Sequence, residues 1–268
     1  MRRNSLSRAE QKRWDRETLR DPHAQPDKAD RVEAMFDAIA PTYERFNTVA
    51  SLGRDAVWRR RAVEAAEVRA GDVALDICCG TGDMVRALAQ ASPRRVIGVD
   101  FSTEMLALGD FAGVDVPIDL IRADALRLPL ADASVDVISC AFGVRNFGDV
   151  QAGLHEMARV ARAGARVIIL EFATPANALL RLAHGIYCRR ILPLVSALLV
   201  RDAVGAYRYL TRSIETFETT TSVERRLNDA GFGEVGIWRM NLGGVVLYRG
   251  VKGQDTRGGQ WELNEGRP

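Results

Sequence analysis

Between residues 73 and 172 the chain alternates short apolar runs with longer segments in which apolar residues recur every three or four positions. The apolar runs have the length of strands and cover residues 73–78, 95–100, 118–123, 135–142 and 165–172. Helical patterns fit between them at residues 83–91, 103–111 and 150–162. This alternation predicts an α/β fold, and strands that are apolar almost throughout are typical of a parallel sheet covered on both faces.

Two more apolar segments, residues 234–240 and 243–250, lie near the C-terminal end of the pattern. They are separated by little more than the turn-like stretch NLGG, and a connection that short joins antiparallel neighbours. We therefore expect a seven-stranded, mainly parallel sheet that ends in an antiparallel strand.

Two helical segments are too long to be plain connections. Residues 31–70 precede the first strand, and residues 174–216 are inserted after the fifth. Long insertions in α/β domains commonly carry function, so we expect both to cover a pocket at the ligand-binding edge of the sheet. Together with the sheet they define one domain over residues 31–252. Residues 1–30 and 253–268 are polar and are predicted to be mobile tails.

Composition narrows the class of protein only a little. A chain of 268 residues with 47% hydrophobic and 27% charged residues is typical of a soluble globular protein. The net charge of +2 is too small to indicate nucleic-acid binding. The four cysteines match neither a zinc site nor a redox CxxC motif, which favours free thiols in a reducing cytosol. We therefore expect a cytoplasmic protein.

The stretch LDICCGTGD, residues 75–83, follows the first predicted strand and begins a helix. Such a loop lies at the carboxyl edge of a parallel sheet, where Gly80 and Gly82 let a ligand approach the backbone. A dinucleotide-binding fingerprint needs a third glycine where this chain has Val85. Asp83 would repel a pyrophosphate but would attract a cationic amino-acid ligand, which favours S-adenosylmethionine (SAM) over a dinucleotide.

Acidic residues at the ends of neighbouring strands support the same cofactor. Asp100 ends the second strand, where a carboxylate can accept two hydrogen bonds from a ribose diol. Asp124 follows the third strand and could accept a hydrogen bond from the amine of an adenine. Asp76 could orient the glycine loop from within the first strand or could simply be half-buried and paired. Because NAD enzymes share the ribose carboxylate, a nicotinamide or flavin dehydrogenase is the alternative.

Several segments outside the loop carry motifs of their own, the longest being MFDAIAPTYERFNTVASLGRDAVWRR at residues 35–60. This segment resembles the first signature of the ubiquinone/menaquinone biosynthesis C-methyltransferase (UbiE/MenG) family. FGVRNF (142–147), ARVARAGARVIILEFATP (158–175) and AYRYLTRSIETF (206–217) resemble three further motifs. The resemblance spans roughly residues 31–252, and the first signature together with FGVRN is far more specific than the glycine loop.

The resemblance implies a class I SAM-dependent methyltransferase fold, Rossmann-like, and methyl transfer from SAM to a ring carbon of a polyprenyl quinol. It places SAM contacts at Thr81, Asp100, Asp124 and Ala125. Ala141 stands where some members use serine, and Asp55 stands where many have histidine, which could alter substrate choice. The sequence does not choose between a naphthoquinol and a benzoquinol.

Methylation of an aromatic carbon needs an electron-rich ring, most of all a quinol that has lost a hydroxyl proton. The candidate catalytic residues are Arg145, to stabilise the phenolate, Asn146, to fix the ring or a water, and Tyr43. The alternative for Arg145 is a structural pair with a carboxylate at the end of the sheet. The candidate quinol-lining residues are Asn47, Tyr207 and Tyr209. We expect no metal, because the three histidines form no ligand cluster.

The partners remain open at this stage. Residues 178–200 alternate leucine, isoleucine and valine with Arg181, Arg189 and Arg190, which suits either a peripheral membrane contact or a helix packed over the sheet. A homo-oligomer and contacts with other quinone-biosynthesis enzymes are also open. The sequence is also compatible with two other functions: a methyltransferase for another aromatic or lipid acceptor, and a non-catalytic scaffold.

Overall fold

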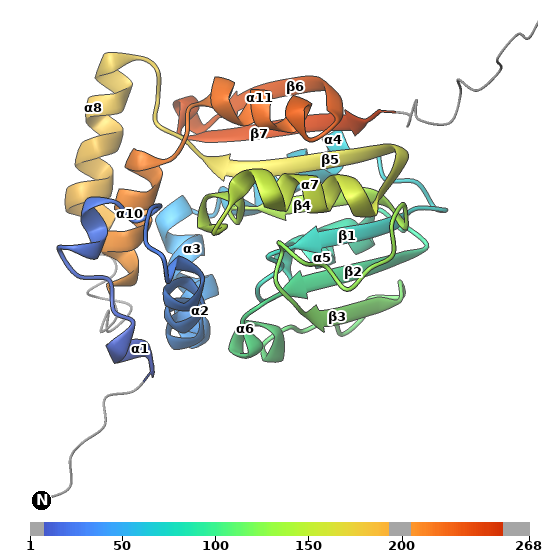
Figure 1. The fold of residues 1–268 in the computed structure, drawn as a ribbon, viewed down its shortest axis with the longest axis horizontal. Helices are drawn as coiled ribbons and strands as arrows, with labels where there is room; N and C mark the ends of the chain where they lie inside the picture. Colours follow the sequence, from blue (N-terminus) through green and yellow to red (C-terminus); the bar gives the residue numbers. More distant parts are fainter. Residues whose placement is uncertain (1–7, 193–204, 254–268) are drawn as a thin grey trace, which may run out of the picture.

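The computed structural model describes residues 8–192 and 205–253 and contains one seven-stranded sheet (Figure 1). The strands lie in the order β3-β2-β1-β4-β5-β7-β6. Their bounds are β1 Val73–Ile77, β2 Arg95–Asp100, β3 Ile118–Arg122, β4 Val135–Ala141, β5 Ala161–Phe172, β6 Phe232–Met240 and β7 Val245–Lys252. All seven coincide with predicted apolar runs, although β5 begins four residues before the predicted 165.

Strand direction agrees with the expectation from the sequence. Strands β1 to β5 pair in parallel, whereas β7 runs antiparallel to both β5 and β6. Each residue of β1 is buried, as a central strand covered on both faces requires. The prediction of a mainly parallel sheet with an antiparallel C-terminal strand is therefore confirmed.

Helices cover the two faces of the sheet (Figure 1). On one face α4 (Asp55–Ala66) and α5 (Asp83–Gln90) pack through side chains such as Trp58 and Leu88. On the other, α7 (Val150–Val160) and α11 (Thr220–Asp229) pack through Leu154 and Leu227, among others. The amphipathic patterns predicted from the sequence thus bury their apolar sides against the sheet.

Two predicted helices end earlier than the periodicity indicated. Helix α6 covers Thr103–Ala107 rather than 103–111, because Gly109 and Asp110 follow and do not favour helix. Helix α7 ends at Val160 because Ala161 already has extended backbone angles and begins β5. The apolar pattern of residues 158–162 suits both structures, so it could not place the boundary.

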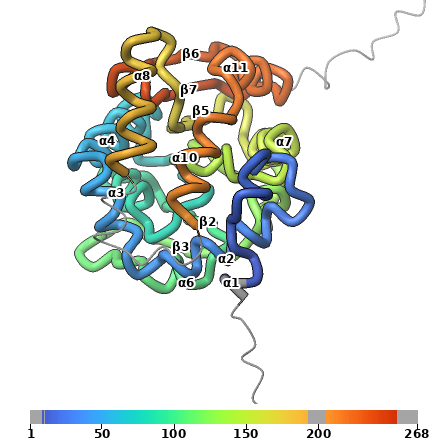
Figure 2. Tube along the Cα trace, turned by 90° about the vertical axis from the view of Figure 1, so that its left-hand side faces the viewer, coloured from blue at the N-terminus to red at the C-terminus, as the bar shows by residue number. Residues whose placement is uncertain are grey.

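The remaining helices gather beyond the carboxyl ends of the parallel strands (Figures 1 and 2). They come from the two inserted segments and are α2 (Lys28–Ile39), the 3-10 turn Ala40–Thr42, α3 (Tyr43–Ser51), α8 (Ala178–Ile186), the π turn Tyr187–Ile191 and α10 (Ala206–Thr216). We refer to these elements as the cap. The predicted insertion also includes residues 193–204, which lie outside the described residues.

The start of the chain departs from the prediction of a mobile tail over residues 1–30. Helix α1 (Arg8–Gln11) and a 3-10 turn (Thr18–Arg20) lie against the cap, and the side chain of Trp14 is 0% exposed. A tryptophan buried to that extent anchors its segment. The predicted tail is therefore wrong for residues 8–30, whereas residues 1–7 and 254–268 lie outside the described residues.

Candidate active site

The glycine loop after β1 is shaped by residues in the left-handed region of backbone space. Gly80 and Gly82 have φ of +55° and +92°, and Gly82 is the N-cap of α5. A Cβ at Gly82 would lie 2.4 Å from Cζ of Phe111, so no side chain fits there. At Gly80, by contrast, nothing lies within 4 Å of that position. The loop backbone at Gly80 is therefore open to a ligand.

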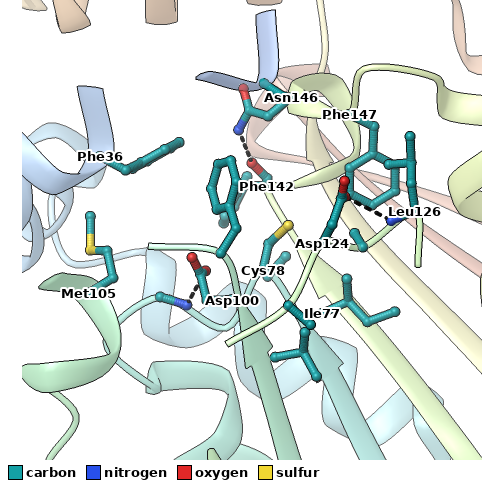
Figure 3. Close-up of a pocket in the computed structure, with 18 of the residues that line it drawn as sticks. Phe36, Ile77, Cys78, Asp100, Met105, Asp124, Leu126, Phe142, Asn146 and Phe147 are labelled. Carbon is teal, nitrogen blue, oxygen red and sulfur yellow. Dashed lines mark hydrogen bonds between the residues drawn. The ribbon is translucent and has the colours of Figure 1, made fainter. Parts of the chain in front are cut away.

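A cavity of about 720 Å³, its open mouth included, lies beside this loop (Figure 3). We call it the sheet cavity. Of the residues predicted to hold a cofactor, Gly80, Asp100, Asp124 and Ala125 line it. Its apolar walls include Phe36, Met105, Leu126, Phe142 and Phe147. Four residues from the ends of three neighbouring strands thus meet in one place, as the order of the strands requires.

Asp100 is the best-fixed acid of the sheet cavity. Its side chain accepts a hydrogen bond from the backbone N–H of Gly80 at 2.8 Å (Figure 3). It also accepts from the backbone N–H of Ser102 at 2.9 Å. Burial raises the pKa of Asp100, and these backbone hydrogen bonds oppose the rise. The same carboxylate therefore ties the glycine loop to the end of β2 and faces the cavity.

Asp124 is more exposed and more loosely held. Its Oδ1 accepts from the backbone N–H of Leu126 at 2.9 Å, which leaves acceptor capacity for a ligand (Figure 3). Apolar side chains around it could sandwich a flat ring, and Asp100 could accept from a diol. The open backbone at Gly80 completes a set of groups that fits S-adenosylmethionine.

Asp83 and Asp76 do not face this cavity. Asp83 forms ion pairs with Arg86 and, at 2.8 Å, with Arg59. Both of its oxygens are engaged by arginines, so the idea that Asp83 attracts a cationic ligand is not supported by the arrangement. Asp76 is 1% exposed and accepts from Ser139 Oγ at 2.6 Å. No hydrogen bond from Asp76 to the glycine loop is present among the described residues.

Burial raises the pKa of Asp76 to about 7, against the smaller opposing effect of the Ser139 hydrogen bond. Its second oxygen, Oδ2, is buried without a hydrogen-bond partner in the described structure. Thr81 and Gly82 are likewise buried in the loop and are not among the residues that line the cavity. These three predicted cofactor contacts therefore do not line the sheet cavity.

A second cavity, of about 1070 Å³ with its mouth included, lies under the cap. We call it the cap cavity. The predicted residues Tyr43, Asn47, Arg145, Tyr207 and Tyr209 all line it. Most of its other walls are apolar or aromatic, among them Met35, Phe46, Trp58, Phe172, Leu192 and Val245. The predicted substrate residues come from three separate segments and nevertheless meet in one cavity.

The two cavities share Phe36, Tyr43 and Phe142 as wall residues. Arg145 and Asn146 are consecutive, yet Arg145 lines the cap cavity and Asn146 lines the sheet cavity. A group bound in one cavity would therefore lie next to a group bound in the other.

Arg145 is 4% exposed and forms an ion pair with Glu171 at 2.8 Å. Its Nη1 also donates to the carbonyl of Phe142, and Glu171 accepts from the backbone N–H of Arg145. This is the structural pairing that the sequence left as an alternative. The guanidinium nevertheless lines the cap cavity, and its buried Nε has no partner among the described residues. Arg145 thus combines a structural pair with a position in the wall of the cap cavity.

Several cavity residues could not be identified from the sequence. Phe36 and Phe142 lie within the quoted motifs, but only tertiary packing places them between the cavities. Arg59 and His184 line the cap cavity and carried no recognisable signal in the sequence. Asp55, noted only as a departure from the family pattern, also lines this cavity, where it binds Ser51 and Arg59, each at 2.8 Å.

No group of three or more His, Cys, Asp or Glu side chains that could hold a metal ion occurs in residues 8–192 and 205–253. Within the same ranges no helix has the length and apolar character needed to cross a membrane.

Comparison with known sequences gives one consistent result. The model of the ubiE/COQ5 methyltransferase family matches residues 24–252. A demethylmenaquinone methyltransferase of Mycolicibacterium vanbaalenii is 40% identical over 227 residues, which are 85% of this chain and 93% of the relative. The ubiquinone/menaquinone biosynthesis C-methyltransferase UbiE of Pseudomonas fluorescens is 35% identical over 231 residues, 84% of this chain and 90% of the relative.

Solved structures agree on the fold. A SAM-dependent methyltransferase from Aquifex aeolicus superposes with a TM-score of 0.55 at 16% identity and covers 78% of this chain and 97% of its own. A SAM-dependent methyltransferase from Thermotoga maritima gives 0.55 at 18% identity, with 82% and 99% covered. The predicted class I methyltransferase fold is thereby confirmed.

Proposed function

The chain belongs to the ubiE/COQ5 methyltransferase family, and we propose that it transfers the methyl group of SAM to a ring carbon of a polyprenyl quinol. The names of its relatives favour a demethylmenaquinol as acceptor, and one relative carries both the ubiquinone and the menaquinone designation. Both a naphthoquinol and a benzoquinol are therefore candidate acceptors. The methyl donor is SAM, whose sulfonium supplies an electrophilic methyl group.

The observation that carries this proposal is the shared wall of the two cavities. The sheet cavity offers a carboxylate and an open glycine backbone to a polar cofactor, whereas the cap cavity is mainly aromatic and aliphatic. Phe36, Tyr43 and Phe142 lie between them. An apolar aromatic ring in the cap cavity would thus lie beside the cofactor, with water largely excluded.

Arg145 is proposed to stabilise the phenolate that makes the ring carbon nucleophilic. Its Nε is a buried donor without a protein partner, and the neighbouring Glu171 fixes the guanidinium in place. A preorganised, buried cation is effective at stabilising developing negative charge because it does not have to reorient. Glu171 also offsets the desolvation of Arg145, so the pair survives without substrate.

Tyr43 and Asn146 are proposed to orient the ring. Burial raises the pKa of Tyr43, so its hydroxyl stays protonated and can donate a hydrogen bond at neutral pH. Asn146 Oδ1 accepts from Tyr209 at 2.9 Å, and Asn146 Nδ2 donates to the carbonyl of Phe142 at 3.4 Å. These bonds fix the wall between the cavities, where alignment of the methyl and the ring carbon decides the rate.

Incubation with labelled SAM and chemically reduced, demethylated quinols tests this function, with products identified by mass spectrometry. Naphthoquinol and benzoquinol acceptors are compared side by side. We expect one additional methyl group on the ring of at least one of them. Arg145→Lys is the matched variant, because it keeps the charge but loses the planar donor fork, and should lower kcat by about a hundredfold. Absence of any ring methylation by the wild type would contradict the proposal.

We also propose that the lipid tail of the acceptor leaves the cap cavity beside α8, where the protein contacts a membrane surface. Helix α8 has no buried residue, and Leu179, Leu182 and Ile186 are 73%, 58% and 51% exposed. His184 of the same helix lines the cap cavity, so α8 forms part of the wall of that cavity. An exposed apolar stripe flanked by Arg181 and Arg189 suits an anionic lipid surface.

A further inference from the structure

The N-terminal strap, which we define as residues 8–28, packs against α10 and the loop that follows β4. Both views show the start of the chain beside α10 (Figures 1 and 2). Most of the strap precedes residue 24, at which the match to the family model begins. None of residues 8–28 lines the sheet cavity or the cap cavity. A role of the strap in the reaction must therefore act through other residues.

Trp14 is the anchor of the strap. Its ring stacks on that of Tyr209, with centroids 4.3 Å apart and planes inclined by 28°, and neither side chain is more than 1% exposed. The backbone of the strap at Trp14 also packs closely against Gly205, since a Cβ at Gly205 would lie 2.5 Å from the carbonyl oxygen of Trp14. Stacked aromatic pairs of this kind contribute beyond the area that they bury. Trp14 therefore fixes the plane of the Tyr209 ring.

Tyr209 links Trp14 to the wall between the two cavities. Its hydroxyl donates to Asn146 Oδ1 at 2.9 Å, and the Asn146 amide donates to the carbonyl of Phe142. Asn146 lines the sheet cavity, and Phe142 lines both cavities (Figure 3). One chain of contacts thus runs from Trp14 through Tyr209 and Asn146 to the position where the methyl group must pass.

Polar contacts hold the strap to the same two elements. Arg212 of α10 donates to the carbonyls of Leu19 and Arg20, each at 3.1 Å. At its other end, the buried Lys28 donates to the carbonyls of Arg145 and Phe147 at 2.9 and 2.6 Å. The strap therefore joins α10 to the loop that carries the candidate catalytic residues, although these elements are separated by about sixty residues in the sequence.

We propose that Trp14 is a positioning residue, which sets Asn146 and the cofactor-facing wall through the Tyr209 hydroxyl. This inference rests on the proposed function for its meaning in catalysis, but it is tested first through SAM binding, which needs no quinol. Trp14→Ala should weaken SAM binding about fivefold, the effect expected when one buried hydrogen bond loses its geometry. Trp14→Phe retains a stacking ring and should restore most of the affinity.

The decisive experiment is a double-mutant cycle that combines Trp14→Ala with Tyr209→Phe. The affinity of each variant for SAM is measured by calorimetry. Tyr209→Phe keeps the ring under Trp14 but removes the hydroxyl that reaches Asn146. In this background Trp14→Ala should change SAM affinity by less than about twofold, because the link is already broken. The same fivefold loss in both backgrounds would overturn the proposal, since Trp14 would then act without Tyr209.

Leu19→Ala is the matched control for a merely structural role. Leu19 packs in the same cluster as Trp14 but does not stack on Tyr209. The Leu19→Ala variant should have a lower unfolding midpoint than the wild type and an unchanged affinity for SAM. If Leu19→Ala weakens SAM binding as much as Trp14→Ala, the strap acts only through stability and the positioning role is refuted.

In turnover, Trp14→Ala should lower kcat in the wild-type background and not in the Tyr209→Phe background. A wild type that binds SAM but methylates no quinol would contradict the proposed function and leave the binding cycle interpretable.

Discussion

At the scale of single residues, the carboxylates around the glycine loop have different tasks. Asp100 accepts from the backbone of Gly80 and Ser102 and lines the sheet cavity, so it shapes the loop and can hold a ligand at once. Asp83 is neutralised by two arginines, and Asp76 is buried behind the loop. Sequence spacing identified these acids as a group, but their surroundings decide which of them can bind a cofactor.

Asp100→Ala should weaken SAM binding by well over tenfold. The change removes a buried acceptor for the ribose and also leaves the backbone N–H groups of Gly80 and Ser102 without their partner. Isothermal calorimetry with SAM measures the effect. Asp119→Ala is the control, because it removes the same charge from a half-exposed pair with Arg95. An affinity equal to that of the wild type would remove Asp100 from the cofactor site.

The raised pKa of Asp76 predicts that the free energy of unfolding depends on pH. Its folded-state pKa is raised to about 7, whereas an aspartate in an unfolded chain titrates near pH 4. Between these values the folded protein retains a proton that the unfolded chain releases, so this group lowers the free energy of unfolding as the pH rises from about 4 to about 7. Above pH 7 its contribution is constant.

Asp76→Asn should remove this slope and raise the free energy of unfolding at pH 8 by about 4 kcal/mol relative to the wild type, since the two pKa values differ by about three units. Asparagine keeps an oxygen for the Ser139 hydroxyl and cannot ionise. Urea unfolding at pH 5 and pH 8 measures the difference. Asp132→Asn, on a side chain 78% exposed, serves as the control and should leave the slope unchanged. A slope that persists in Asp76→Asn would assign the pH dependence to another group.

At the scale of elements, packing within the chain does not explain the exposed apolar side of α8. Its apolar residues at positions 179, 182 and 186 lie on one side of the helix, and that side faces away from the core. A helix of nine residues does not bury enough apolar surface to be stable by itself. The exposed stripe is therefore better explained by a partner than by packing within the chain.

Replacing both Leu179 and Leu182 by serine should reduce co-sedimentation with anionic liposomes several-fold, because most of the inserted apolar area is lost. Vesicles of neutral lipid should bind the wild type more weakly than anionic vesicles, since the arginines flanking the stripe then have no counter-charge. Leu108→Ser, at an exposed leucine after α6, should not alter binding. Wild-type protein that stays in the supernatant with both vesicle types would refute the membrane contact.

At the scale of the whole molecule, the two cavities exist only because the cap is folded over the carboxyl end of the sheet. The sheet cavity takes Phe36 from α2 and Asp100 from β2, and the cap cavity takes residues from α3, α4, α8 and α10. No single element forms either cavity. Binding of SAM should therefore stabilise sheet and cap together.

At a SAM concentration 100 times its Kd, the free energy of unfolding of the wild type should rise by about 2.7 kcal/mol, because the unfolded chain has no site for SAM. Urea unfolding with and without SAM measures this increase. For Asp100→Ala at the same concentration we expect about half of it or less, since its affinity is lower. An equal increase in both proteins would mean that SAM binds elsewhere.

The sequence determined all seven strands and the antiparallel end of the sheet. A central strand such as β1 is apolar almost throughout because it is covered on both faces, and the short NLGG connection determined the antiparallel end. Motif spacing likewise identified Gly80, Asp100 and Asp124 at the strand ends, where the order of parallel strands brings them together. These features depend on local patterns, so a single sequence is enough to locate them.

Only the tertiary structure decided how those residues are used. It engaged Asp83 with Arg59 and Arg86, paired Arg145 with Glu171, and stacked Trp14, from a segment predicted to be a tail, on Tyr209. Apart from the local pair of Asp83 with Arg86, each of these contacts joins residues that lie far apart in the sequence. Trp14 is an isolated apolar residue among charged neighbours, and its burial depends on a surface formed by α2 and α10. Periodicity reports which side of an element is buried, whereas the partner it is buried against is fixed only when the chain has folded.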